Sequence, residues 1–204
     1  MLNLIVAAWM ALPLYPLNPT VQDTLAPMSI HLAAGINGPN HLAGLGPYAS
    51  IKYELLVKHP LVIRGSLDYN YGRIGSALYP DGRLHVATLS AEMLVYRGTN
   101  HTTGYMGAGL VYYRGFLSLD NDAADSLYRN ESVTNVDLGG RLGVRLLLGL
   151  RFSRDIALEL GLTEVRPTLR TTTEQANGGY SELNERVRLH DVRLTVGYIL
   201  PLRR

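Results

Sequence analysis

Hydrophobic and polar residues alternate with a period of two along most of the chain after residue 27. Neighbouring side chains of a β-strand point to opposite faces, so this period predicts strands rather than helices. Most of the runs are about 9–15 residues long, whereas strands of soluble proteins average about 5–6 residues and a tilted strand crosses a bilayer with about 9–11 residues. The predicted strands cover residues 29–36, 49–57, 63–71, 84–96, 103–117, 135–151, 156–163 and 191–202.

The connections between these strands alternate in length. The short ones cover residues 58–60, 98–100 and 153–154, and the long ones cover residues 37–47, 74–83, 118–133 and 171–189. Up-and-down strands produce this order when all the long loops lie at one rim. The sequence therefore predicts an all-β protein: a transmembrane, up-and-down, antiparallel β-barrel of about eight strands over residues 28–202.

The apolar strand faces are expected to contact lipid, because the polar faces lack the dense Lys and Glu cover of a soluble barrel. They carry mainly Gly, Ser, Thr and Ala, with isolated charges of both signs. Side chains fill the lumen of an eight-stranded barrel, and an unpaired buried charge costs several kcal/mol. The predicted network of paired lumen charges comprises Lys52, Glu54, Arg64, Asp68, Glu92, Asp137, Arg141, Arg145, Arg151, Glu159, Asp191 and Arg193. Loss of one partner, as in Arg141→Leu, is expected to lower thermal stability.

Tyrosine is the abundant aromatic residue, with 13 copies against two phenylalanines and one tryptophan. Aromatic side chains form girdles where a membrane barrel meets the lipid headgroups. Several tyrosines fall near the ends of predicted strands and are expected to belong to such girdles: Tyr48, Tyr71, Tyr79, Tyr105, Tyr113 and Tyr198.

The composition of the 204 residues excludes several kinds of functional site. The chain is 47% hydrophobic and only 18% charged. The absence of cysteine excludes disulfides, cysteine zinc sites, iron–sulfur clusters and thiol catalysis. A net charge of +2 does not indicate a nucleic-acid partner. No cofactor or metal is expected, because the six histidines form no HExxH or other closely spaced metal-binding set.

Residues 1–27 differ from the rest of the chain. An apolar stretch covers residues 2–14, and prolines interrupt it at positions 13, 16 and 19. It is shorter than the roughly 20 residues of a transmembrane helix. Its length fits the apolar part of a secretory signal, although no Lys or Arg precedes Lys52. Two interpretations stay open: a signal-peptide remnant, or an apolar N-terminal arm.

The last predicted strand carries the most specific resemblance. Thr195, Gly197, Tyr198, Leu200 and Leu202 are similar to the C-terminal assembly signal of small eight-stranded outer-membrane barrels, the OmpX/OmpA-like group of the porin-like families. The usual terminal aromatic residue is replaced by leucine, and two arginines follow. The resemblance covers roughly residues 28–202. It implies location in a bacterial outer membrane, contact with outer-membrane lipid and lipopolysaccharide, and insertion by the outer-membrane assembly machinery.

An enzymatic function is not expected. Some small barrels modify lipid A, and a deacylase of this kind needs a Ser–His–acid set near the outer rim. His85 is the best candidate base, with Ser76 or Ser90 as the nucleophile. However, the alternation directs Ser90 into the lumen and His85 outward, so the pair is poorly oriented.

The expected role is structural or surface-interacting, as a single barrel or as a subunit of a larger envelope assembly. A protein partner would bind through the loops at 118–133 and 171–189 or through the N-terminal arm. The first of these loops is acidic, with Asp120, Asp122, Asp125 and Glu131. Three alternatives stay open: a lipid A-modifying enzyme, a narrow channel, and a barrel that binds a small hydrophobic ligand.

Overall fold

The computed structural model describes residues 26–38, 44–76, 79–98, 102–119, 131–152, 155–175 and 178–202. Residues 1–25, which make up nearly all of the predicted signal remnant or arm, lie outside the described residues. No helix in the described ranges is long and apolar enough to cross a membrane. The strands are β1 (Met28–Asn37), β2 (Gly46–Lys58), β3 (Leu61–Ser76), β4 (Tyr79–Gly98), β5 (Thr102–Leu119), β6 (Glu131–Phe152), β7 (Ile156–Val165), β8 (Thr168–Gln175), β9 (Tyr180–Arg186) and β10 (Leu189–Leu202).

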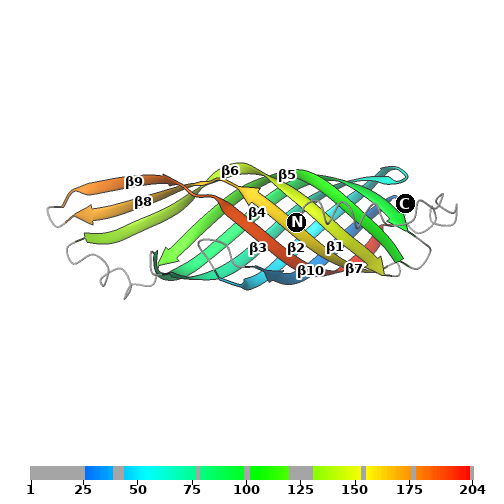
Figure 1. Ribbon diagram of the computed structural model, residues 1–204, viewed down its shortest axis with the longest axis horizontal. Coiled ribbons are helices and arrows are strands. Elements are labelled where there is room, and N and C mark those ends of the chain that lie inside the picture. Colours follow the sequence, from blue (N-terminus) through cyan, green and yellow to red (C-terminus); the bar gives the residue numbers. More distant parts are fainter. Residues whose placement is uncertain are drawn as a thin grey trace.

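The strands form one antiparallel sheet that closes on itself (Figure 1). From β1 to β7, each strand pairs with the next one along the chain. β7 then pairs with β10, and β10 pairs with β1 over ten residue pairs from Met28–Leu202 to Asn37–Arg193. Eight strands therefore make a closed ring, which confirms the predicted barrel. Closure leaves no edge in the ring, so the backbone polar groups of the wall bond to neighbouring strands.

Three segments continue beyond the ring at one end. β8 pairs with the first part of β6, over residues 131–138, and β9 pairs with β8. Arg166 and Pro167 separate β7 from β8, and Val187 and Arg188 separate β9 from β10. We call residues 131–138, 168–175 and 180–186 the outer sheet. It projects to the left of the barrel in Figure 1.

Two predicted loops are wrong. The segment 171–189 mostly forms the β8–β9 hairpin, because β6 continues past the ring and offers its backbone groups to β8. Its threonines at 171–173 are β-branched and favour strand. The segment 74–83 is also mostly strand, since β3 extends to Ser76 and β4 begins at Tyr79. Within the predicted loop 118–133, residues 120–130 lie outside the described residues.

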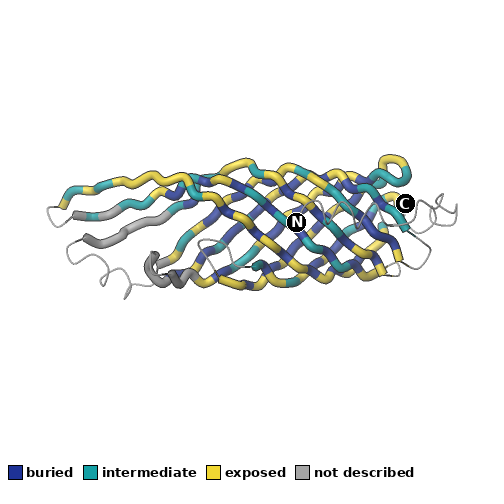
Figure 2. The backbone as a smooth tube through the Cα atoms, in the orientation of Figure 1, coloured by how far each residue is buried: buried dark blue, intermediate teal, exposed yellow. Residues whose placement is uncertain are grey.

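The barrel wall has an apolar outer face and a polar inner face. Outward side chains such as Ile51, Leu67 and Leu142 are 57%, 58% and 70% exposed, whereas inward Lys52 and Arg145 are buried. Figure 2 shows the alternation along the strands of the barrel. Soluble proteins bury apolar residues and expose charged ones. The reverse arrangement fits a wall that faces lipid.

A β-bulge in β6 overturns part of the predicted alternation. Tyr113 of β5 pairs with Arg141, but the next pair joins Gly115 to Leu138, so β6 contains one extra residue. A bulge of this kind shifts the strand by one position and reverses which side chains face inward. Leu138 is therefore buried inside, and Asp137 is partly exposed and paired with Arg114. Arg141 is exposed beside the bulge. The assignment of Asp137 and Arg141 to the lumen is thus wrong.

Candidate functional site

Among the described residues, the lumen holds ten buried Lys, Arg, Asp and Glu side chains, five basic and five acidic. Each is at most 6% exposed. They come from six strands, because inward positions recur at every second residue of each strand. They are Lys52 and Glu54 on β2, Arg64 and Asp68 on β3, Glu92 on β4, Arg145 and Arg151 on β6, Glu159 on β7, and Asp191 and Arg193 on β10.

Arg64 lies at the centre of one group of charges and is fully buried. Its Nε and Nη2 donate to Oε1 of Glu54 at 2.9 and 2.7 Å, and its Nη1 donates to Glu159. Glu159 also accepts a hydrogen bond from Lys52 Nζ at 2.7 Å. The Nε2 atom of His31 lies 3.0 Å from Glu54 Oε2. Each carboxylate in this group therefore has more than one donor.

Arg145 lies at the centre of a second group. Its Nη1 is 2.7 Å from Asp68 Oδ2 and 3.0 Å from Glu92 Oε1. Ser90 also donates to Glu92, at 2.7 Å. The guanidinium of Arg145 donates further hydrogen bonds to four hydroxyl groups, those of Ser66, Ser90, Thr88 and Thr163. Polar partners thus surround this buried cation on several strands.

Arg193 connects the two groups. Its Nη1 donates to Asp68 Oδ2 at 3.1 Å, and its Nη2 lies 3.6 Å from Glu159 Oε1. Its guanidinium stacks over the Tyr48 ring at 5.2 Å. Arg151 and Asp191 are also buried and have interaction partners of their own. Ion pairs that link β2, β3, β4, β6, β7 and β10 across the lumen oppose distortion of the ring.

Apolar clusters flank the charge network on both sides along the barrel. The inward side chains of β4 show the layering in chain order: Leu84, Val86, Thr88, Ser90, Glu92, Leu94 and Tyr96. The outer cluster contains Leu84, Val86, Tyr113, Leu138, Val165, Leu169 and Leu189. The inner cluster contains Val62, Leu94, Tyr96, Tyr105 and Leu147. Sequence reasoning missed both clusters, although the change from apolar to polar and back was readable along β4.

Three tyrosines predicted for the girdles lie inside the lumen instead: Tyr48, Tyr105 and Tyr113 are at most 5% exposed. The Tyr105 ring stacks on Tyr96 at 5.0 Å and lies 5.1 Å from the Arg64 guanidinium. Its cross-strand partner is Gly149, and a Cβ at that position would collide with the ring. Glycine therefore provides the space for this tyrosine. The side chain of Tyr198 does face outward, 52% exposed.

The residues of the catalytic alternative are not brought together. Ser90 is buried and donates to Glu92. His85 lies on the outer face, where its Nδ1 is 2.6 Å from the Tyr69 hydroxyl. The side chain of Ser76 lies outside the described residues. Within the described part of the chain, no group of three or more His, Asp and Glu side chains is placed to hold a metal ion.

A hollow of about 640 Å³ opens on the lipid-facing side of the wall. Small residues, Ala34 and Ala49, lie between larger exposed ones such as Leu67 and Val196. Its lining is almost entirely apolar.

The residues of the predicted assembly signal lie on β10. Thr195 and Gly197 face the lumen, whereas Tyr198 and Leu200 face outward. β10 pairs with β1 and β7 and so closes the ring.

The fold is similar to those of three solved outer-membrane proteins. OprG from Pseudomonas aeruginosa has a TM-score of 0.60 and 11% identity, covering 87% of this chain and 97% of OprG. The neisserial surface protein NspA has a TM-score of 0.55 and 15% identity, covering 87% and 98%. AlkL, solved in lipid bilayers, has a TM-score of 0.54 and 10% identity, covering 88% and 92%. The sequence itself matches no protein-family model and no curated protein.

These observations define the class of protein. A closed antiparallel ring with an apolar outer face is the fold of the small bacterial outer-membrane β-barrels. The predicted eight-stranded, up-and-down barrel fold, of the kind found in porin-like outer-membrane proteins, is confirmed. At such low identity, the likeness to OprG, NspA and AlkL concerns the fold alone.

Proposed function

We propose that this protein is a closed, non-enzymatic barrel of a bacterial outer membrane, with a structural and surface-interacting role. The observation that carries the proposal is the filled lumen. Five buried cations and five buried anions occupy its centre, and apolar clusters pack on both sides of them. An open pore needs a water-filled path, whereas these side chains are desolvated and bonded to one another.

The outer sheet supports the interaction part of the proposal. It extends beyond the ring, and β9 pairs with β8 alone among the described strands. Tyr180 and Leu183 of β9 are 68% and 64% exposed. A strand edge with exposed apolar side chains is a common surface for protein contacts. This surface takes the place of the predicted partner loop at 171–189, and the loop at 118–133 and the N-terminal arm stay further candidates.

We also propose that β10 is the strand recognised by the outer-membrane assembly machinery. The resemblance of Thr195, Gly197, Tyr198, Leu200 and Leu202 to an assembly signal supports this proposal. Its position as the last strand of the ring adds further support.

Conductance tests the closed lumen. The full-length protein, reconstituted in a planar lipid bilayer, is expected to show no steady ion conductance, because both apolar clusters exclude water from the charge network. The comparison is a variant with Leu94 and Tyr96 both replaced by glycine, since it removes two of the five buried side chains of the inner cluster. Regular current steps from the unmodified protein would contradict the proposal and favour the channel alternative.

Lipid A provides the test of the enzymatic alternative. Purified lipid A incubated with the reconstituted protein is expected to keep its mass, because Ser90 and His85 point to opposite sides of the wall. Mass spectrometry of the extracted lipid measures the result. Loss of an acyl chain that depends on His85 would overturn the non-enzymatic assignment.

A further inference from the structure

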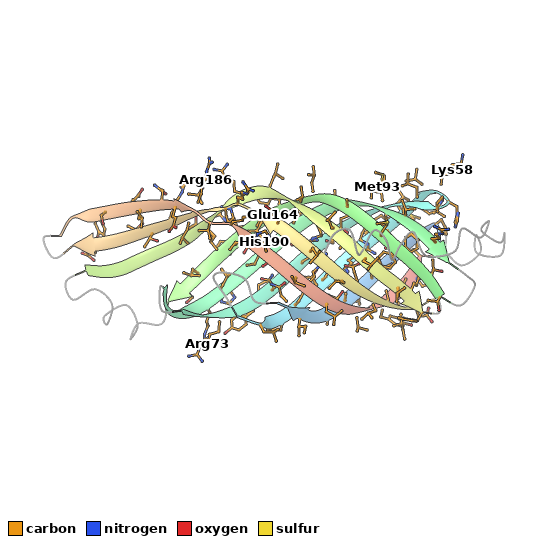
Figure 3. All side chains as sticks on the ribbon, in the orientation of Figure 1. Lys58, Arg73, Met93, Glu164, Arg186 and His190 are labelled. Carbon is orange, nitrogen blue, oxygen red and sulfur yellow. The ribbon has the colours of Figure 1, made fainter. Side chains whose placement is uncertain are left out.

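Six arginines gather on the outward surface where the barrel meets the outer sheet. All six are exposed, and they come from β5, β6, β8, β9 and the two short links beside Pro167 and Val187. In Figure 3, Arg186, Glu164 and His190 lie at this junction, whereas Lys58 lies at the opposite end of the barrel. We call this set the arginine cluster: Arg114, Arg141, Arg166, Arg170, Arg186 and Arg188.

The arginine cluster lies directly against the apolar outer face of the wall. On β6, Arg141 is followed by Leu142 and Val144, which are 70% and 54% exposed. On β5, Arg114 lies two residues beyond Tyr112, which is 45% exposed. The change from apolar to basic side chains marks the level at which the lipid chains end and the headgroups begin.

In the described part of the chain, few acidic residues lie at the level of the arginine cluster. Glu164 accepts from Arg188 Nη2 at 2.9 Å and Arg166 Nη2 at 3.4 Å, and Asp137 lies 3.6 Å from Arg114. Among the described residues at this level, two carboxylates therefore face six guanidinium groups, each with five N–H donors. Further acidic residues, Glu174 and Glu182, pair with Tyr180 and Thr172 nearer the tip of the outer sheet.

A separate pair of arginines lies in a similar position on another side of the barrel. Arg73 of β3 and Arg83 of β4 are direct cross-strand partners, and both are exposed. Two like charges placed opposite each other destabilise a sheet unless an anion lies between them. Arg73 lies two residues after Tyr71, and Arg83 lies two residues before His85, the cross-strand partner of Tyr71. The two arginines therefore also lie just beyond the aromatic part of the wall. Figure 3 shows Arg73 at the same end of the barrel as Arg186.

We propose that the arginine cluster binds the phosphate groups of a phosphorylated glycolipid in the outer leaflet, of the lipid A type. Guanidinium groups bind phosphate oxygens through two parallel hydrogen bonds, which explains the use of arginine rather than lysine. The boundary position favours a lipid headgroup over a soluble anion, because the ligand's acyl chains would cover the apolar wall directly beside the arginines. The Arg73–Arg83 pair provides a second contact of the same kind.

Native mass spectrometry of the full chain in detergent tests this inference, with phosphorylated lipid A as the probe. Wild-type protein is expected to retain bound lipid A, and to bind the same lipid after removal of its phosphates about 10- to 100-fold more weakly. This comparison needs no variant and so does not depend on altered folding. Equal binding of the two lipids would overturn the proposal.

Variants locate the binding surface. Combined replacement of Arg166, Arg186 and Arg188 by glutamine is expected to weaken lipid A binding about 10- to 100-fold. Lys58→Gln, which removes an exposed cation at the other end of the barrel, is the matched control and should leave binding unchanged. A gel-mobility shift on boiling verifies that each variant is folded. An unchanged affinity in the folded triple variant, or binding of a soluble phosphorylated polysaccharide but not of lipid A, would overturn the assignment.

Discussion

Arg64→Leu lowers the free energy of unfolding by about 3–5 kcal/mol, the expected effect of removing one partner from a buried ion pair. Arg64 is completely buried and donates to both Glu54 and Glu159. Leucine would leave these carboxylates with fewer donors in a lumen from which water is excluded. The measurement is the urea midpoint of the protein in lipid vesicles, followed by circular dichroism and by the mobility shift on boiling.

Arg141→Leu is the matched control for this experiment. The side chain is exposed beside the β6 bulge, so its loss is expected to change the free energy of unfolding by no more than about 0.5 kcal/mol. This reverses the effect that the sequence pattern predicts for the same substitution. Similar midpoints for the two variants would show that the buried charges do not stabilise the barrel.

Tyr105→Ala is expected to lower the free energy of unfolding by about 3–5 kcal/mol, as large-to-small substitutions of buried aromatic residues do. The ring is 1% exposed and fills the space above Gly149, and its hydroxyl donates to Glu159 at 3.0 Å. Alanine would remove the stack with Tyr96 and leave a cavity beside Arg64. The same urea midpoint measures the effect.

Two further tyrosine variants separate the causes. Tyr105→Phe keeps the ring and loses the hydrogen bond to the Glu159 carboxylate, so a smaller loss of about 1.5–3 kcal/mol is expected. Tyr112→Ala changes a lipid-facing ring that is 45% exposed. If Tyr105 belonged to a surface girdle, its alanine variant would be no more destabilised than that of Tyr112.

The sequence alone determined the type of fold, and it determined which face of each strand points to the lumen and which to lipid. The alternation of apolar and polar residues is a local property, because successive side chains of each barrel strand point in turn to lipid and to the lumen. The runs around Lys52, Asp68 and Glu159 therefore revealed which faces point inward without any knowledge of strand pairing. The near-equal number of basic and acidic residues on those faces followed from the cost of unpaired buried charge.

The sequence also contained signals that pattern reading did not use. Tyr105 and Tyr113 fall at the same alternate positions as Gly107 and Gly109, on the face opposite the apolar residues, so their inward direction was readable. Their closeness to strand ends indicated a girdle instead. The adjacent pair Gly139-Gly140 was the only mark of the β6 bulge, and two glycines do not by themselves specify an extra residue.

The tertiary structure decided which charged side chains form ion pairs with each other. Lys52 bonds to Glu159, 107 residues away, and Arg193 to Asp68, 125 residues away. Such pairs depend on the register between strands that are distant in the chain, and ring closure sets that register. The outer sheet and the positions of Arg170 and Arg186 have the same origin, because they require β6 to continue past the ring and pair with β8. A period of two defines the two faces of each strand. The register between neighbouring strands, in contrast, is set only when the barrel closes.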